Sequence, residues 1–308
     1  MAIRLFIDGA AGTTGLEIRE RLQGRGEFEL LVLDGAQRKD ESARRHALHA
    51  ADIAILCLPD DAAKDAVKLA EGSDTRIIDA SSAHRVADGW TYGFPELIGH
   101  DKIANAQFVS NPGCYPTGFL ALVAPLVRAG LVPADWPYTV NAVSGYSGGG
   151  NALIARFEAE GAPAFRAYGY DMAHKHRPEM KAYANLKHGV IFAPAVVPTY
   201  RGMVVEVPLH LGAMAGEPSA DQLRDAIGEF FSDSQVISLG AEEGISEILL
   251  EPSAHPSDSM TLHVFGNTGG WHARLVAVLD NLGKGASGAA IQNLNIMCGL
   301  PETTGLRL

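Results

Sequence analysis

The chain of 308 residues is long for one hydrophobic core, so two domains are expected. Its 47% apolar and 20% charged residues are ordinary for a globular protein, and its net charge of −11 argues against partners such as nucleic acid or an anionic membrane. The three cysteines are few and lack metal-type pairing, which argues against a disulfide framework or a cysteine zinc site. Because no apolar run has membrane-spanning length and the first one is too short for a signal peptide, we expect a cytoplasmic enzyme.

The first part of the chain alternates apolar runs with helical spacing. Predicted helices include Thr14–Leu22 and Asp61–Glu71, and the predicted strands are Ile3–Asp8, Phe28–Leu33, Ala51–Leu58, Thr75–Ala80 and Gln107–Ser110. Strands that are apolar on both faces and alternate with helices predict a parallel sheet covered on both sides. We therefore expect an α/β, Rossmann-type doubly wound domain over residues 1–115.

The rest of the chain has a different pattern. Predicted strands are Tyr138–Ser144, Val190–Val197, Met203–Leu211, Ile245–Leu250 and Thr261–Gly266, with few helices between them after residue 185. This pattern predicts a mixed or antiparallel sheet in an α+β domain over residues 116–284. The apolar residues of Gly285–Leu300 have helical spacing, so residues 285–308 are expected to return to the first domain as a helix.

A glycine-rich loop lies between the first predicted strand and the first predicted helix. Glycines at such a position let a backbone approach a pyrophosphate, while the helix N-terminus supplies N–H donors and a positive dipole end. The spacing G-x-x-G-x-x-G departs from the usual fingerprint, so a tight turn without a ligand is the alternative. The residues assigned to dinucleotide binding are Gly9, Gly12, Thr13, Thr14 and Gly15.

The segment after the second predicted strand bears on the choice between NAD and NADP. Asp34 suits a ribose 2′-hydroxyl and so favours NAD, whereas Arg38 and Lys39 suit a 2′-phosphate and so favour NADP. The residues alone leave this choice open.

Cys114 stands in the segment SNPGCYPTG, where Pro112 and Gly113 predict a turn and Pro116 suits the first turn of a helix. A cysteine at a helix N-terminus is favoured as thiolate, the nucleophilic form. Cys57 and Cys298 lie in apolar runs and are expected to be structural. The alternative for Cys114 is a small buried residue in a turn.

Two histidines, His174 and His176, stand in HKHRPEM just before a helix start predicted from Pro178. The positive end of a helix dipole keeps a histidine neutral, as a general base must be. The competing interpretations are a solvated basic loop and a metal site with Glu179, which lacks an evident further ligand cluster, so we expect no metal.

A second glycine-rich loop, SGYSGGG, covers residues 144–150 close to the expected domain junction. It suits a phosphate or the nicotinamide end of a cofactor, and its alternative is a plain linker. The residues assigned to the cofactor here are Ser147, Gly148 and Gly149.

Taken together, these segments resemble N-acetyl-γ-glutamyl-phosphate reductases, and more closely their shorter form. The resemblance is carried, in this order, by IDGAAGTTGLEIRERL, ADIAILCLPDDAA, DASSAHR, YGFPEL, SNPGCYPTG, GYSGGG, HKHRPEM and GASGAAIQNLN. It implies NADP(H), an acyl-phosphate substrate, and a homodimer or homotetramer. It also implies a catalytic Cys114 and a base at His174 or His176. Further assignments are Ser81 and Asn293 for the cofactor and Asn111, Arg85 and Arg201 for the substrate.

The reaction that this resemblance implies is thioester formation on Cys114, with loss of phosphate, followed by hydride transfer that yields an aldehyde. A related aspartate-semialdehyde dehydrogenase would use the same cysteine chemistry on another acyl phosphate. A Cys–His hydrolase or acyltransferase is an alternative from a different class, but it leaves the first glycine loop unexplained. A non-catalytic nucleotide-binding regulator is a third alternative.

Overall fold

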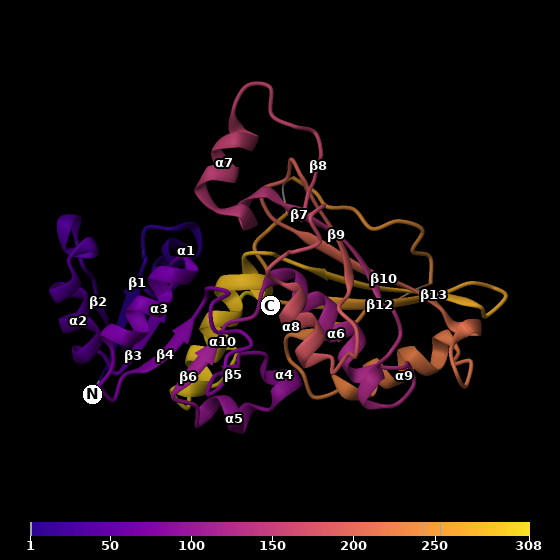
Figure 1. The fold of residues 1–308 in the computed structure, drawn as a ribbon, viewed down its shortest axis with the longest axis horizontal. Coiled ribbons are helices and arrows are strands. Elements are labelled where there is room, and N and C mark those ends of the chain that lie inside the picture. The colour runs from indigo at the N-terminus through magenta and orange to yellow at the C-terminus, as the bar shows by residue number, and fades with distance from the viewer. Residues whose placement is uncertain (1, 242, 253) are drawn as a thin grey trace. The chain divides into compact units, whose positions relative to one another are not determined.

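The computed structural model describes residues 2–241, 243–252 and 254–308. The chain divides into two compact units, of which the first comprises Met1–Pro112 and Ala286–Leu306 and the second Gly113–Gly285 and Arg307–Leu308. Figure 1 draws both units, coloured from indigo at the N-terminus to yellow at the C-terminus.

The first unit is built on a six-stranded parallel sheet in the order β2-β1-β3-β4-β6-β5, which confirms the predicted Rossmann-type fold. The strands are β1 Ile3–Asp8, β2 Phe28–Leu31, β3 Ile53–Leu56, β4 Arg76–Asp79, β5 Thr91–Tyr92 and β6 Phe108–Ser110. The helices are α1 Thr13–Leu22, α2 Glu41–Ala50, α3 Asp60–Leu69, α4 Pro95–Ile98, α5 His100–Ala104 and α10 Gly288–Met297, with a 3₁₀ turn, η1, at Gly35–Lys39.

Both faces of this sheet are buried, as strand alternation requires. On β1, Leu5 and Ile7 point into one apolar cluster, which α1 enters with Ile18 and α10 with other apolar side chains. Phe6, between them, points into a second cluster that contains Leu48 of α2. Because successive side chains of a strand point to opposite faces, one strand can help to bury helices on both sides.

The second unit holds a seven-stranded mixed sheet in the order β11-β12-β13-β10-β7-β9-β8. The strands are β7 Thr139–Gly145, β8 Arg166–Ala167, β9 Ile191–Val197, β10 Met203–His210, β11 Ile237–Leu239, β12 Met260–Gly266 and β13 His272–Leu279. The helices are α6 Cys114–Arg128, α7 Gly150–Glu158, α8 Arg177–Tyr183 and α9 Ala220–Phe230. The turns are η2 Tyr146–Gly149 and η3 Leu211–Ala213, and the π-helical η4 Gly283–Ser287 lies where the chain passes from the second unit to the first.

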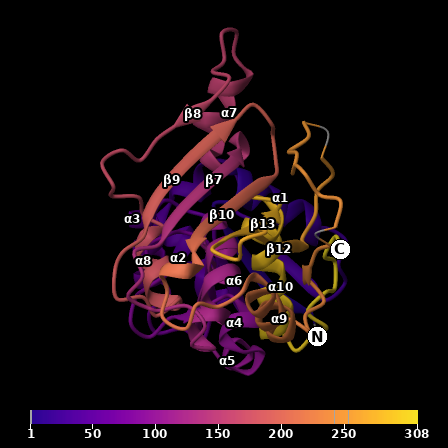
Figure 2. The same cartoon turned by 90° about the vertical axis from the view of Figure 1, so that its right-hand side faces the viewer.

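One face of this second sheet is covered by helices. Helix α6 packs against β10, β12 and β13 and also contacts α8 and α9. Figure 2 shows the strands with α6 behind them. On the opposite face, the half-buried Val143, Val204 and Val278 lie side by side on β7, β10 and β13. No helix among the described residues is long and apolar enough to cross a bilayer.

The structure corrects one expectation for the second domain. The strand predicted at Ile245–Leu250 is wrong, since these residues form no strand and Leu249 is 65% exposed. Both edges of β12 are paired, one with β11 and the other with β13. Among the described residues of 186–284, α9 is the one α-helix, which agrees with the few helices expected there, and its capping box, formed by Ser219 and Gln222, is a start signal that the sequence does contain.

Candidate active site

The first glycine loop joins β1 to α1, and close backbone contacts require glycine at two of its three glycine positions. Gly9 has a φ of +87°, and a Cβ there would lie 2.2 Å from the Cys57 carbonyl oxygen. A Cβ on Gly15 would lie 2.4 Å from the Gly9 oxygen, so the first turn of α1 packs directly on the loop. A Cβ on Gly12 would meet only one atom, at 3.6 Å, which leaves open space in front of the loop.

This open space fits a cofactor pyrophosphate. Gly12 is the N-cap of α1 and offers no capping side chain, so Thr13 and Thr14 begin the helix with backbone N–H groups directed toward the loop. Arg38 and Lys39, the cations expected near a 2′-phosphate, are exposed on η1, and Arg38 Nε donates only a long bond of 3.5 Å to the Gly35 oxygen. Asp34 is also exposed.

Ser81 lies in the loop after β4, within a network built on the fully buried Asp79. The Ser81 hydroxyl donates to Asp79 Oδ2 at 2.7 Å, and its N–H donates to Oδ1 at 2.9 Å. The Nδ1 atom of His84 lies 2.6 Å from the same Oδ2, and the His84 ring stacks on Trp90 at 4.1 Å between centroids. The loop at the carboxyl end of β4 is therefore rigidly held, as a cofactor-binding edge requires.

Arg85, Asn111 and Asn293, predicted from separate motifs, form one buried chain of contacts. Arg85 Nε donates to the Asn111 carbonyl oxygen at 3.0 Å, and Asn293 Nδ2 donates to Asn111 Oδ1 at 3.2 Å and to the Gly93 oxygen at 2.9 Å. A Cβ on Gly93 would lie 2.5 Å from Asn293 Nδ2. Asn293 Oδ1 is buried with no hydrogen-bond partner among the described residues, which fits an acceptor for a cofactor amide.

Cys114 is the first residue of α6, as predicted. Its N-cap, Gly113, provides no side-chain cap, so the dipole of this long helix acts directly on the thiol position and favours negative charge there. The Gly113 N–H donates to Oε2 of Glu179, a carboxylate 1% exposed, at 3.1 Å. On the other side the chain packs against Gly285, where a Cβ would lie 2.9 Å from the Cys114 Cβ.

The two histidines lie together beside the ring of Tyr115, the residue that follows Cys114. Their ring centroids are 4.7 Å apart and lie 6.2 Å (His174) and 5.8 Å (His176) from the Tyr115 ring. His176 is the N-cap of α8, as expected from Pro178. Nδ1 of His174 accepts the His176 backbone N–H at 3.2 Å, which orients the His174 ring.

Tyr168 belongs to this cluster, although no sequence signal pointed to it. Its hydroxyl donates to the Tyr115 hydroxyl at 3.4 Å. Burial raises the pKa of Tyr168, and the electrostatic effect of Cys114 adds to the rise. Tyr168 therefore keeps its proton at neutral pH and donates a hydrogen bond to the hydroxyl of Tyr115, the neighbour of Cys114 in the chain.

The second glycine loop and Arg201 are held by two consecutive residues that the sequence did not single out. Asp280 Oδ2 accepts from Arg201 Nη1 at 2.6 Å. Asn281 accepts the Gly202 N–H at 2.9 Å and donates to Ser147 Oγ at 2.8 Å. These contacts tie the loop that contains Ser147, Gly148 and Gly149 to the turn that follows β9.

The three free cysteines differ in how readily their thiols ionise and react. Burial, with Asp79 and Asp8, raises the pKa of Cys57 to about 12, and burial raises that of Cys298 to about 11. Since only a thiolate reacts with iodoacetamide, we expect peptide mass spectrometry of the native protein at pH 8 to find alkylation at Cys114 alone. Equal labelling of Cys298 would contradict this, and denatured protein, labelled at all three sites, is the control.

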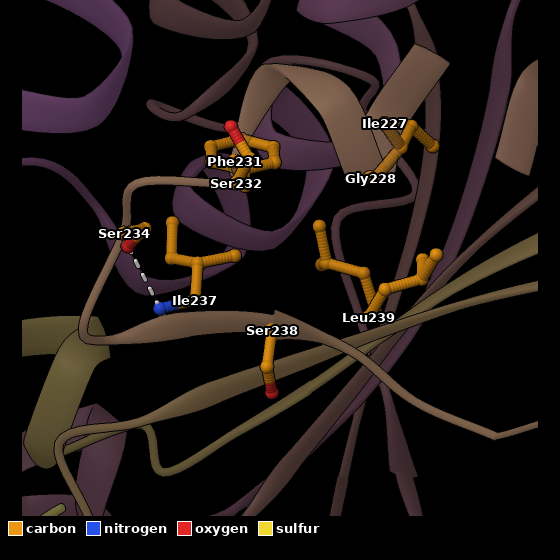
Figure 3. A pocket seen from close by; sticks show the side chains of 9 residues that line it. Ile227, Gly228, Phe231, Ser232, Ser234, Ile237, Ser238 and Leu239 are labelled. Carbon is orange, nitrogen blue, oxygen red and sulfur yellow. Dashed lines mark hydrogen bonds between the residues drawn. The ribbon is translucent and has the colours of Figure 1, made fainter. Parts of the chain in front are cut away.

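Metal sites and the pocket in Figure 3 are weaker candidates for an active site than the cluster around Cys114. The described residues contain no group of three or more His, Cys, Asp or Glu that could hold a metal ion. Figure 3 shows the pocket beside α9 and β11, where Phe231, Ile237 and Leu239 supply apolar walls and the polar side chains are serines. Such a lining contains no general base and therefore no nucleophile that a base could activate.

Comparisons with known families agree with this two-part architecture. Residues 4–106 match the family model described as "Semialdehyde dehydrogenase, NAD binding domain", and residues 114–281 match "Semialdehyde dehydrogenase, dimerisation domain". Among solved structures, aspartate semialdehyde dehydrogenase II of Vibrio cholerae, complexed with ASA, has a TM-score of 0.72 at 18% identity, with 97% of this chain and 99% of that chain covered. The enzyme of Candida albicans, with NADP, has a TM-score of 0.68 at 15% identity, covering 97% and 99%. At these identities the likeness concerns the fold alone.

Curated relatives are much closer in sequence. The protein named N-acetyl-gamma-glutamyl-phosphate reductase 2 of Nostoc sp. is 47% identical, with 98% of this chain and 99% of the relative covered. Proteins named N-acetyl-gamma-glutamyl-phosphate reductase from Chelativorans sp. and Brucella ovis are each 48% identical. They cover 96% and 97% of this chain, and 98% and 100% of their own lengths.

Proposed function

Because this chain belongs to the semialdehyde dehydrogenases and, among them, to the N-acetyl-γ-glutamyl-phosphate reductase family, we propose that it reduces N-acetyl-L-glutamyl 5-phosphate to N-acetyl-L-glutamate 5-semialdehyde and phosphate, a step of arginine biosynthesis. The observation that carries this proposal is the position of Cys114 at the uncapped start of α6, in one cluster with two histidines and Tyr168.

The reaction starts at the Cys114 sulfur. A histidine of the H-x-H pair takes the thiol proton, and the thiolate attacks the acyl carbon, so that a C–S bond forms as the C–O bond to phosphate breaks. NADPH, when bound, supplies the hydride that reduces this thioester. The protonated histidine then gives its proton to the oxyanion, and it takes the hydroxyl proton back as the C–S bond of the thiohemiacetal breaks, which releases the aldehyde and the Cys114 thiolate.

The remaining predicted residues divide between the two ligands. Gly12 leaves room for the pyrophosphate, while Gly9 and Gly15 permit the close packing of the loop on its neighbours. Asn293 Oδ1 is available for the nicotinamide amide. Arg201 is proposed for the substrate anion, where Asp280 fixes its guanidinium plane.

The three free cysteines support a reducing compartment, so we propose a cytoplasmic location.

An assay in the oxidative direction tests the substrate. Purified protein is given NADP⁺, phosphate and either N-acetylglutamate 5-semialdehyde or aspartate semialdehyde, and NADPH is followed by absorbance. We expect phosphate-dependent turnover of the first compound. Turnover of aspartate semialdehyde alone would overturn the substrate assignment, and no turnover of either would overturn the reaction class.

We also propose that the protein is at least a homodimer, formed through the open face of the second sheet. That face carries the row of half-buried valines on β7, β10 and β13, and a sheet face of this kind needs a cover. A carboxylate in the middle of an apolar interface costs several kcal/mol, so Val204→Asp is expected to convert the dimer, or a tetramer built from such dimers, into smaller species. Light scattering after gel filtration measures the mass, and an unchanged mass contradicts this interface.

A further inference from the structure

A nearly buried ion pair in the first unit joins Arg44 of α2 to Asp8 of β1. Arg44 of α2 donates from Nε at 3.0 Å and from Nη2 at 2.8 Å to the same oxygen, Oδ2, of Asp8. The Arg44 side chain is 15% exposed and that of Asp8 is 5% exposed. Two hydrogen bonds in a nearly buried setting fix the guanidinium plane.

This arrangement leaves part of the guanidinium available. Among the described residues the Arg44 side chain makes hydrogen bonds only to Asp8, and these use one N–H each of Nε and Nη2. The Nη1 donors remain for a ligand at the exposed part of the side chain. Planar donors held in a fixed direction suit phosphate oxygens, which accept two parallel hydrogen bonds.

The position of the pair points to one part of a dinucleotide. Asp8 is the last residue of β1 and directly precedes Gly9, the start of the glycine loop. Strand β2 runs parallel to β1 with Leu31 opposite Phe6, so both strands end at the same edge of the sheet. In doubly wound folds the adenosine ribose binds at this edge, where an arginine accommodates a 2′-phosphate.

The other candidates for this role are less well placed. Arg38 and Lys39 are exposed on η1, and an exposed cation contributes little to ion pairing because water screens it. Asp34, which would favour NAD, is exposed as well. Arg44 is the only one of these residues that the fold holds by a nearly buried ion pair.

Resting on the NADP dependence proposed above, we propose that Arg44 recognises the 2′-phosphate of the cofactor and so determines the preference for NADP over NAD. Asp8 is then a positioning residue, which acts by holding the guanidinium. The sequence pointed instead to Arg38 and Lys39 because they follow β2 directly.

Binding of cofactor fragments tests this without any turnover. Isothermal titration calorimetry compares 2′,5′-ADP with 5′-AMP on the wild-type chain, Arg44→Gln and Arg44→Lys. Hydrogen bonds to charged groups contribute enough for a loss of about 10- to 100-fold, so Arg44→Gln should weaken 2′,5′-ADP by that factor and change 5′-AMP less than about twofold. Arg44→Lys should give an intermediate loss of 2′,5′-ADP affinity, because lysine keeps the positive charge but lacks the planar set of donors of the guanidinium.

Matched controls are Arg38→Gln and Lys39→Gln, which remove exposed cations of the neighbouring turn and should change the 2′,5′-ADP affinity by less than about threefold. Equal weakening of both fragments by the Arg44 variants would make the ion pair structural and overturn the proposal. So would a loss of preference in a control variant but not in Arg44→Gln or Arg44→Lys. A wild-type chain with no preference for 2′,5′-ADP would refute the proposed NADP dependence itself.

Discussion

Replacement of Cys114 by serine is expected to lower kcat by about 10³- to 10⁵-fold, since removal of a covalent nucleophile leaves only binding and electrostatic contributions. A serine hydroxyl at the start of α6 feels the same helix dipole, but its pKa lies far above that of a thiol, so almost no alkoxide forms. Turnover is measured by NADPH consumption, and cofactor affinity by calorimetry. The affinity should stay within about twofold of wild type, because the dinucleotide loop belongs to the other unit.

The control for this exchange is Cys298→Ser, which makes the same chemical change at a cysteine outside the cluster. It should leave kcat nearly unchanged. Full activity of Cys114→Ser would refute covalent catalysis, whereas loss of cofactor binding along with activity would indicate misfolding. A nucleotide-binding regulator predicts a third outcome, in which the variant retains its biological function.

The sequence predicted the first unit well because its strands are buried on both faces. Apolar runs such as Ile3–Asp8 have few interpretations other than a buried strand when helices alternate with them. The second sheet has one covered and one open face, so its apolar signal is weaker. The pattern at Ile245–Leu250 resembles a strand, but a strand also needs a free neighbouring edge, and this cannot be read from a local pattern.

In the candidate site, too, some residues could be predicted from local sequence signals and others could not. Local signals placed Cys114 at a helix start and His176 before another, because glycine and proline have specific positions at helix ends. The partners that hold these groups come from distant segments. Glu179 is 66 residues from Gly113, Asp280 is 79 from Arg201, and Arg44 is 36 from Asp8. Such pairs are fixed by the tertiary fold, and no motif in the chain relates them.

A single methyl group at Gly285 is expected to lower kcat by about 100-fold while the fold is retained. In Gly285→Ala the new Cβ would lie 2.9 Å from the Cys114 Cβ and 3.1 Å from the Asp280 oxygen. Neither neighbour is the end of a flexible side chain. The Gly285 N–H also donates to that Asp280 oxygen at 3.0 Å, which limits how far the turn can retreat, so Cys114 has to shift.

A shift of about 1 Å at a reacting atom is enough for a loss of this size, because covalent capture depends on alignment of the sulfur with the acyl carbon. Steady-state kinetics should therefore show a reduced kcat with a smaller change in KM, and alkylation of Cys114 should slow as well. Gly26→Ala is the matched control, since a Cβ there meets nothing within 4 Å and the exchange should be neutral. If Gly285→Ala retained the wild-type kcat, the packing of this turn would not set the position of the sulfur.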